Sequence, residues 1–312
     1  MNIQKFRQMG ISTSRLDSWI CRKKFWYIIN NWYNPNSNSN KNTYFGNLGH
    51  YLLENCLQNE KTEYSYDILL SKCREYDSKN SKNLFNLEPS DLELDKGLAI
   101  SVITEFLNLW YSEGKNMLSN LQKNFSIIKN ELNLKRIHYL NSRFNLKIDL
   151  TLQNRKNKKI WLCDYKFKSR FDDSILLKKL SFDQQLYLYS GCFEQAYKNQ
   201  IPVEGLYQII IRKPQLRKTK KDKDLMIFIE RVTEDIKNRP EHYFFPLSIL
   251  IDQNQKEIFE SEMKQKMNEI YKTLQLGEKA FYKNTAVCDT PYTCDFLDAC
   301  STGNMDLFLK YF

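Results

Sequence analysis

The stretch RFNLKIDLTLQNRKNKKIWLCDYKF, residues 143–167, decides the fold that we expect for this chain. Its two ends, Arg143–Leu152 and Lys159–Phe167, are rich in apolar and aromatic residues, as strands are. The polar run Asn154-Arg155-Lys156-Asn157 between them has the composition of a turn. The stretch therefore predicts two consecutive strands that pair through this turn.

The predicted strands also carry acidic residues and a lysine. Side chains alternate between the two faces of a strand, so Asp164 and Lys166 are expected on one face and Tyr165 on the other. If the strands pair, Asp149 reaches the same edge as Asp164. Two carboxylates there could bind Mg²⁺ or Mn²⁺, and Lys166 could orient or deprotonate an attacking water. A D-x-K pattern is also typical of an exposed strand face, so the pattern alone leaves both interpretations open.

Helices and further strands are predicted on both sides of this stretch. Before it, we expect a helix capped by Ser12 or Ser14 and ending near Tyr33, a polar loop over residues 34–40, a helix from near Phe45, a helix from about Asp91 to Tyr111, and a strand over Ser126–Leu134. After it, we expect a helix over Ser181–Tyr197, strands over Leu206–Arg212 and Leu225–Val232, and a helix from Gln253 to about Leu276.

This order predicts an α/β fold with a central mixed β-sheet flanked by helices. We expect residues 1–312 to form one elaborated domain. Within it, residues 1–120 are mainly helical, residues 121–250 form the α/β core, and residues 251–312 form a C-terminal helix and a cysteine-containing segment.

The composition favours a polyanionic partner. Lysine and arginine number 47 and aspartate and glutamate 37, which gives a formal net charge of +10. A genome rich in A and T would produce the same excess of lysine without such a partner. No run of 18 apolar residues occurs, and the first residues lack the apolar core of a signal peptide. We therefore expect a cytoplasmic protein without a membrane span.

Basic residues are concentrated between the two strands expected at Leu206–Arg212 and Leu225–Val232. They are Arg212, Lys213, Arg217, Lys218, Lys220, Lys221 and Lys223. Contact with phosphates and a solvated hairpin tip both explain such a run. Aromatic residues near the N-terminus (Trp19, Trp26, Tyr27 and Trp32) are spaced as in core packing, which we prefer to base stacking.

Four of the eight cysteines form a widely separated set. Cys288, Cys294 and Cys300 follow one another at even spacing, and Cys21 lies far upstream. Four thiolates can bind Zn²⁺ or a [4Fe–4S] cluster. Zinc sites usually contain closely spaced cysteine pairs, which this set lacks, so a cluster that joins the two chain ends is favoured over zinc or free thiols. The remaining cysteines are expected in the core: Cys56, Cys73, Cys163 and Cys192.

The ordered set of motifs resembles the PD-(D/E)XK nuclease superfamily. It is similar in particular to the RecB-type and AddB-type nuclease domains with an iron–sulfur cluster, including CRISPR-associated and bacteriophage members. The resemblance rests on five segments in order: Ser12-Thr13-Ser14-Arg15-Leu16 through Cys21 and Phe25, Gly46-Asn47-Leu48-Gly49-His50, Asp149, Asp164-Tyr165-Lys166, and Gln185-Leu186-x-x-Tyr189.

The resemblance implies a restriction-endonuclease-like sheet and a role for each matched residue. His50, Asp149, Asp164 and the Tyr165 carbonyl would bind Mg²⁺ or Mn²⁺. Lys166 would be the catalytic lysine, with Gln185 and Tyr189 positioning the lysine and the DNA. Cys21, Cys288, Cys294 and Cys300 would hold a [4Fe–4S] cluster, and Glu131 lies where relatives often carry a further acidic residue.

The expected function is a Mg²⁺- or Mn²⁺-dependent deoxyribonuclease. We expect an exonuclease that acts on single strands or duplex ends in DNA replication, recombination or repair, in a bacterial or bacteriophage-infected cell. The chain has no helicase motif, so unwinding would come from a helicase or recombination partner. Two alternatives stay open at this point: a non-catalytic iron–sulfur DNA-binding subunit of a larger complex, and a structural zinc protein.

Overall fold

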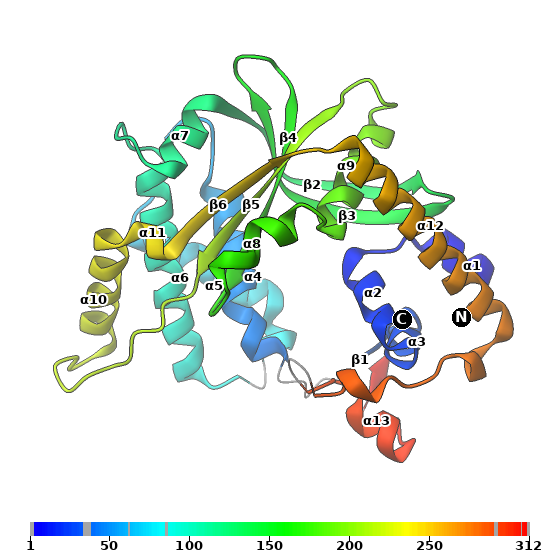
Figure 1. Ribbon diagram of the computed structural model, residues 1–312. Helices are drawn as coiled ribbons and strands as arrows, with labels where there is room; N and C mark the ends of the chain where they lie inside the picture. Colours follow the sequence, from blue (N-terminus) through cyan, green and yellow to red (C-terminus); the bar gives the residue numbers. More distant parts are fainter. Residues whose placement is uncertain are drawn as a thin grey trace.

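A five-stranded mixed sheet forms the centre of the protein (Figure 1). The computed structural model describes residues 3–33, 39–61, 63–84, 87–289, 293–306 and 308–310. The strands of the central sheet are β2 (Phe125–Tyr139), β3 (Ser142–Asn154), β4 (Ile160–Lys168), β5 (Val203–Arg212) and β6 (Phe244–Leu250). They lie side by side in sequence order, and only the β4–β5 pair is parallel. The predicted α/β class and mixed sheet are therefore confirmed.

Helices account for most of the remaining chain. Before the central sheet come α1 (Ile3–Met9), α2 (Thr13–Asp17), α3 (Arg22–Ile29), α4 (Ser39–Cys56), α5 (Tyr66–Leu84), α6 (Pro89–Trp110) and α7 (Met117–Asn124). Between or after its strands come α8 (Asp173–Leu180), α9 (Gln184–Ala196), α10 (Leu225–Asn238), α11 (Pro240–Tyr243), α12 (Gln253–Leu276) and α13 (Leu297–Thr302). No helix within the described ranges combines the length and hydrophobicity that crossing a bilayer requires.

The hairpin between β3 and β4 forms as predicted. The two strands pair antiparallel from Gln153 opposite Ile160 to Leu150 opposite Cys163. In the turn, the Asn154 side chain accepts the N–H groups of Lys156 and Asn157 at 2.9 and 3.2 Å. An asparagine that binds the backbone two and three residues further on stabilises a tight turn. This turn fixes the register that brings Asp149 next to Asp164.

Two hydrophobic clusters cover the two faces of the sheet. One packs α4, α5, α6 and α10 against side chains that include Cys163 and Tyr165. The other packs the N-terminal helices, α9 and α12 against side chains that include Leu162 and Leu206. The alternation along β4 therefore places Cys163 and Tyr165 in one cluster and Leu162 in the other. Tyr165 points away from the face of Asp164 and Lys166, as expected.

The two end regions of the chain lie together. A separate two-stranded sheet joins β1 (Trp32–Tyr33) to β7 (Leu309–Lys310) in antiparallel register. Aromatic rings reinforce this contact, since Phe25 stacks on Phe281 with centroids 6.4 Å apart. Figure 1 shows α3 and α13 close to the marked chain ends. Packing of apolar side chains thus brings the segments that contain Cys21 and the C-terminal cysteines into one region.

The predicted strand at Leu225–Val232 is wrong, because this segment belongs to helix α10. Its buried residues recur at helical spacing: Phe228, Ile229, Val232 and Ile236. Asp224 caps the helix by accepting the N–H of Ile227 at 2.9 Å. The strand that pairs antiparallel with β5 is instead β6. A short run of apolar residues fits both the two-residue period of a strand and the 3.6-residue period of a helix. The longer pattern that reaches Ile236 fits only the helix.

The boundaries of the first helices also differ from the prediction. The Ser12 cap is confirmed, but the helix expected to reach Tyr33 breaks at Cys21, whose backbone is extended. The Ser18 hydroxyl donates to the Arg15 carbonyl at 2.6 Å, a local bond of the kind that competes with helix continuation. Helix α4 begins at Ser39 rather than near Phe45. Of the predicted polar loop, residues 34–38 lie outside the described residues.

Candidate active site

Asp149 and Asp164 lie at the point where the paired strands separate. The ladder between β3 and β4 ends at Leu150 and Cys163, and the two aspartates are the next residues on their strands. There the Asp149 Oδ2 atom accepts the backbone N–H of Tyr165 at 2.8 Å. A carboxylate thus takes the place of a backbone acceptor and is held by the opposite strand. The sheet itself fixes the position of Asp149.

Lys166 and Asp164 are linked to helix α9 through Gln185. The Lys166 Nζ atom lies 2.8 Å from Asp164 Oδ2 and donates to Gln185 Oε1 at 2.7 Å. The Gln185 amide in turn donates to Asp164 Oδ1 at 3.1 Å and to the Tyr189 hydroxyl at 2.5 Å. Residues 185 and 189 share one face of α9 because they are one helical turn apart. The sequence prediction that these four residues belong together agrees with these contacts.

The Asp164 carboxylate is buried and only partly neutralised. Burial raises its pKa to about 6, Lys166 opposes this shift, and the charge of Asp149 adds to it. Lys166 Nζ lies 2.8 Å from Asp164 Oδ2, and Gln185 donates to Asp164 Oδ1. A buried carboxylate is costly unless it is paired with a cation or hydrogen-bonded. A positive neighbour therefore favours the charged form of Asp164.

His50 reaches the site from helix α4. Its Nδ1 atom lies 3.4 Å from Asp149 Oδ2, and its ring packs against Phe167 with centroids 5.1 Å apart. Helix α4 approaches β4 closely because Gly49 has no side chain: a Cβ atom there would lie 2.3 Å from Phe167 Cε1. The G-x-x-x-H segment thus works through packing, since Gly49 allows the approach that brings His50 to Asp149.

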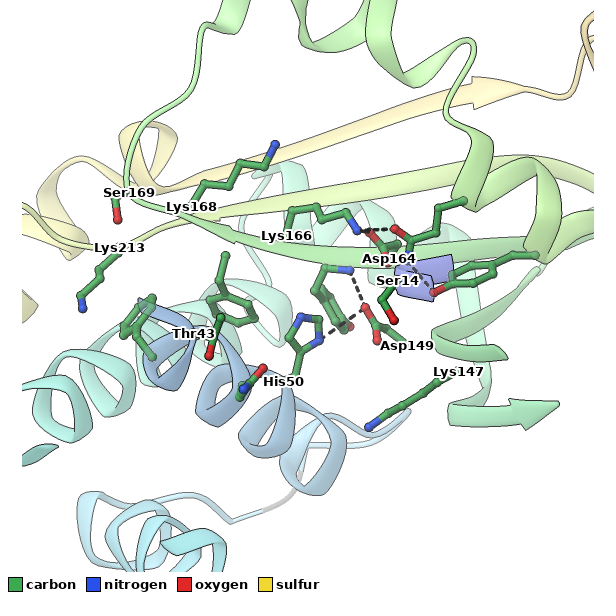
Figure 2. Close-up of a pocket in the computed structure, with 17 residues that line it drawn as sticks. Ser14, Thr43, His50, Lys147, Asp149, Asp164, Lys166, Lys168, Ser169 and Lys213 are labelled. Carbon is green, nitrogen blue, oxygen red and sulfur yellow. Dashed lines mark hydrogen bonds and ion pairs between the residues drawn. The ribbon is translucent and has the colours of Figure 1, made fainter. Parts of the chain in front are cut away.

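These residues line a cavity of about 610 Å³. Figure 2 shows its lining, to which α2, α4, β3, β4 and α9 all contribute. The cavity also contains residues that the sequence analysis did not assign to the site: Thr43, Lys147, Lys168, Ser169 and Lys213. Lys168 could have been found, because it continues the alternation of Asp164 and Lys166 along β4. The others depend on contacts between distant segments, which no local pattern reveals.

Glu131 lies beside this cavity rather than in its lining. It forms an ion pair with Lys147, whose ammonium group is also 3.9 Å from Glu54 Oε2. Burial and the nearby Glu131 raise the pKa of Glu54 to about 7. The acidic residue that the family resemblance suggests is thus placed next to the site and contacts one of its lysines.

The four cysteines of the proposed cluster lie near one another. Burial raises the pKa of the Cys300 thiol, and Cys21, Cys294 and Cys288 raise it further. The Cys21 sulfur accepts the backbone N–H of Asn284 at 3.4 Å. Backbone N–H groups directed at sulfur stabilise thiolates that bind a cluster. Cys21, Cys288 and Cys294 therefore lie close enough to Cys300 to influence its charge.

Aromatic side chains surround the cysteine region. Tyr27 stacks on Phe296 with centroids 5.0 Å apart, and Phe296 stacks on Phe308 at 5.5 Å. Burial and the neighbouring Cys300 raise the pKa of Tyr27 to about 12. Residues 290–292, between the first two C-terminal cysteines, lie outside the described residues. As expected, the other four cysteines are buried in the two core clusters: Cys56, Cys73, Cys163 and Cys192.

Neither the acidic residues of the cavity nor the four cysteines form a complete metal site in this structure. Within the described part of the chain, no three His, Cys, Asp or Glu side chains are arranged so that they could hold a metal ion. Both metal sites therefore stay predictions. A comparison with protein-family models finds no match, and a comparison with curated proteins finds none either.

Proposed function

We propose that the protein is a Mg²⁺- or Mn²⁺-dependent DNA nuclease, with the restriction-endonuclease-like site that its motifs suggest. The observation that carries this proposal is the gathering of Asp149, Asp164 and Lys166 at the end of one strand ladder. Residues from α4 and α9 complete the group, and all of them line one cavity. An exposed alternating strand face would not bury Asp164 to 3% exposure or bond it to Gln185 of helix α9.

The residues present fit a hard divalent cation. Mg²⁺ and Mn²⁺ prefer carboxylate and carbonyl oxygens and retain several waters. Asp164 is a buried carboxylate that faces the Lys166 ammonium group, and Asp149 lies next to it on the neighbouring strand. Asp149, Asp164, His50 and the Tyr165 carbonyl would hold the cation. A bound cation would lower the pKa of a coordinated water and neutralise charge on the phosphate.

The side chains of the protein have separate tasks in this proposal. The Lys166 ammonium group faces the cavity and would donate to the attacking water and to a non-bridging phosphate oxygen. Gln185 holds Lys166 by accepting its hydrogen bond and holds Asp164 by donating to it. Tyr189 accepts from the same amide and fixes its orientation. A substrate phosphate thus meets a charged donor whose direction is set before it arrives.

We further propose that Cys21, Cys288, Cys294 and Cys300 bind a [4Fe–4S] cluster. The proposed ligands are four thiols, and the other three influence the charge of Cys300. The backbone N–H of Asn284 donates to the Cys21 sulfur. Stacked aromatic rings lie in the same region, where Cys21 is buried and the other three cysteines are partly exposed. The cluster would close a loop that contains almost the whole chain.

Digestion of end-labelled DNA tests the catalytic proposal. Protein purified without oxygen is incubated with single-stranded and duplex DNA in the presence of Mn²⁺. We expect loss of the label from linear substrates, whereas closed circular DNA stays intact if the enzyme is an exonuclease. Asp164→Ala protein prepared in parallel controls for contaminating nucleases. Absence of any Mn²⁺-dependent cleavage on all these substrates contradicts the proposal and favours a DNA-binding subunit.

A further inference from the structure

The lysines of the cavity differ in whether an acidic partner neutralises them. Lys147 pairs with Glu131, Lys166 with Asp164, and Lys213 with Asp95 at 2.5 Å. Lys168 also lines the cavity, yet within the described residues it has no ion pair and no hydrogen bond from its side chain. Figure 2 shows the Lys168 side chain extending from β4 without a dashed line to any neighbour.

The surroundings of Lys168 are positively charged. Burial lowers its pKa, the neighbouring Lys166 and Lys179 lower it further, and Asp183 and Asp164 oppose this effect. Lys168 is exposed in the lining of the cavity, so its ammonium group is accessible to an anion that enters there. An anion bound at this position would reduce the repulsion between Lys168 and the neighbouring lysines.

The position of Lys168 on β4 indicates which phosphate group of DNA it could bind. Asp164, Lys166 and Lys168 occupy alternate positions, so their side chains leave the strand on one face. Two residues along a strand cover about 6.6 Å. Consecutive phosphates of one DNA strand are separated by an axial rise of about 3.4 Å and by more through space. The strand therefore offers one ammonium group to the cleaved phosphate and a second to a neighbouring one.

We propose that Lys168 binds the phosphodiester group adjacent to the one that is cleaved and thereby sets the register of the DNA strand on the active site. This inference rests on the proposed nuclease function. Lys168 acts as a positioning residue, since it contacts neither the reacting phosphate nor the metal ligands. Its contact is to the backbone, so the interaction contributes the same affinity for every base sequence.

Substitution of Lys168 separates binding from chemistry. Lys168→Ala should raise KM by about 10-fold with kcat little changed, because a charge-assisted hydrogen bond to substrate is lost. Lys168→Arg, which keeps the charge, should restore most of the affinity. Lys156→Ala removes one positive charge from the exposed β3–β4 turn and serves as the matched control. Unchanged KM in Lys168→Ala, or an equal effect of Lys156→Ala, overturns the proposal.

A scan of the DNA backbone identifies the phosphate. Single neutral methylphosphonate linkages are placed in turn at each position around the cleavage site, and binding is measured with Ca²⁺ to suppress cleavage. For the unsubstituted protein, one linkage next to the cleaved phosphate should weaken binding by about 10-fold. The same linkage should have no further effect on Lys168→Ala protein.

The two experiments distinguish failure of this inference from failure of the proposed function. If the protein cleaves DNA but Lys168→Ala shows the same linkage sensitivity as the unsubstituted protein, only the role of Lys168 is wrong. If no DNA is cleaved by the unsubstituted protein, the proposed function is wrong, and the role of Lys168 falls with it.

Discussion

The candidate active site and the cysteine region are held together by different forces. In the active site, strand register and hydrogen bonds from β3, β4 and α9 define the positions of Asp149, Asp164 and Lys166. In the cysteine region, stacked aromatic rings bring distant segments together, and the described contacts of the Cys21 and Cys288 sulfurs are to the Asn284 backbone. The first geometry is thus built into the sheet, whereas the second depends on packing between segments that are far apart in the chain.

This difference predicts different consequences of mutation. Substitutions in the active site should remove activity while the fold survives, because the sheet is stabilised by the two large hydrophobic clusters. Substitutions of the cysteines should reduce stability, because a cluster would be the strongest link between the chain ends. The following experiments test that separation.

The largest effect is expected from Asp164 and Lys166. Asp164→Ala and Lys166→Ala should each reduce cleavage by at least about 10³-fold, since one would remove a proposed metal ligand and the other a proposed charged donor to the transition state. Only Asp164→Ala should weaken Mn²⁺ binding in a calorimetric titration, and both should keep a melting temperature near that of the unsubstituted protein. Cleavage at the original rate in both variants would place the active site elsewhere.

A large loss of stability is expected when the cluster is prevented from forming. Anaerobically purified protein should be brown and contain about four iron atoms per chain. Cys21→Ala or Cys300→Ala should lose this iron and lower the melting temperature by roughly 10–20 °C, by analogy with a cross-link that closes a long loop. Iron analysis and thermal unfolding measure both effects.

Cys192→Ala is the matched control for this experiment. Cys192 is buried in the core on α9, so its loss should lower stability through a small cavity but leave the iron content unchanged. Colourless protein with one equivalent of zinc, or iron retained in the Cys21 and Cys300 variants, would contradict the cluster assignment.

A smaller effect is expected from the glycines of α4, and it tests how this helix is held against the sheet. Gly49→Ala places a Cβ atom against the Phe167 ring and should cost about 1–3 kcal/mol of stability while displacing His50 and lowering activity. Gly46→Ala meets its nearest neighbour, Phe167 Cβ, at 3.4 Å. It should be neutral or stabilise by up to about 1 kcal/mol, because alanine favours the helix.

Chemical denaturation and a cleavage assay on the two glycine variants provide the comparison. Equal behaviour of Gly46→Ala and Gly49→Ala would show that close packing of α4 on β4 does not position His50. Retention of full activity in a destabilised Gly49→Ala protein would remove His50 from the proposed metal site.

The smallest effect is expected outside both regions, in the segment between β5 and α10. Lys218, Lys220 and Lys221 are exposed there. Replacing all three by glutamine should reduce the slope of log K against log[salt] for DNA binding by up to about three units, with kcat unchanged. A slope equal to that of the unsubstituted protein would show that these lysines are solvated and do not contact DNA.

The sequence predicted the strands β3 and β4 better than the elements around them. The β3–β4 hairpin could be predicted because its turn residues and alternation are local. The Gln185–Tyr189 spacing likewise placed both residues on one face of α9. The segment at Leu225 was assigned to a strand because a short apolar run has no unique period. The helix boundaries at Cys21 and Ser39 also differed from those that the local pattern predicted.

The sequence by itself determined that Asp164 and Lys166 share a strand face and that Tyr165 turns away, because alternation is a property of any strand. The tertiary structure alone decided that His50 meets Asp149 and that Lys213 is neutralised by Asp95 while Lys168 is not. It also decided that the Cys21 and Cys288 sulfurs both contact the backbone of Asn284. Such contacts join residues far apart in the chain, and packing of whole elements against one another sets their distances.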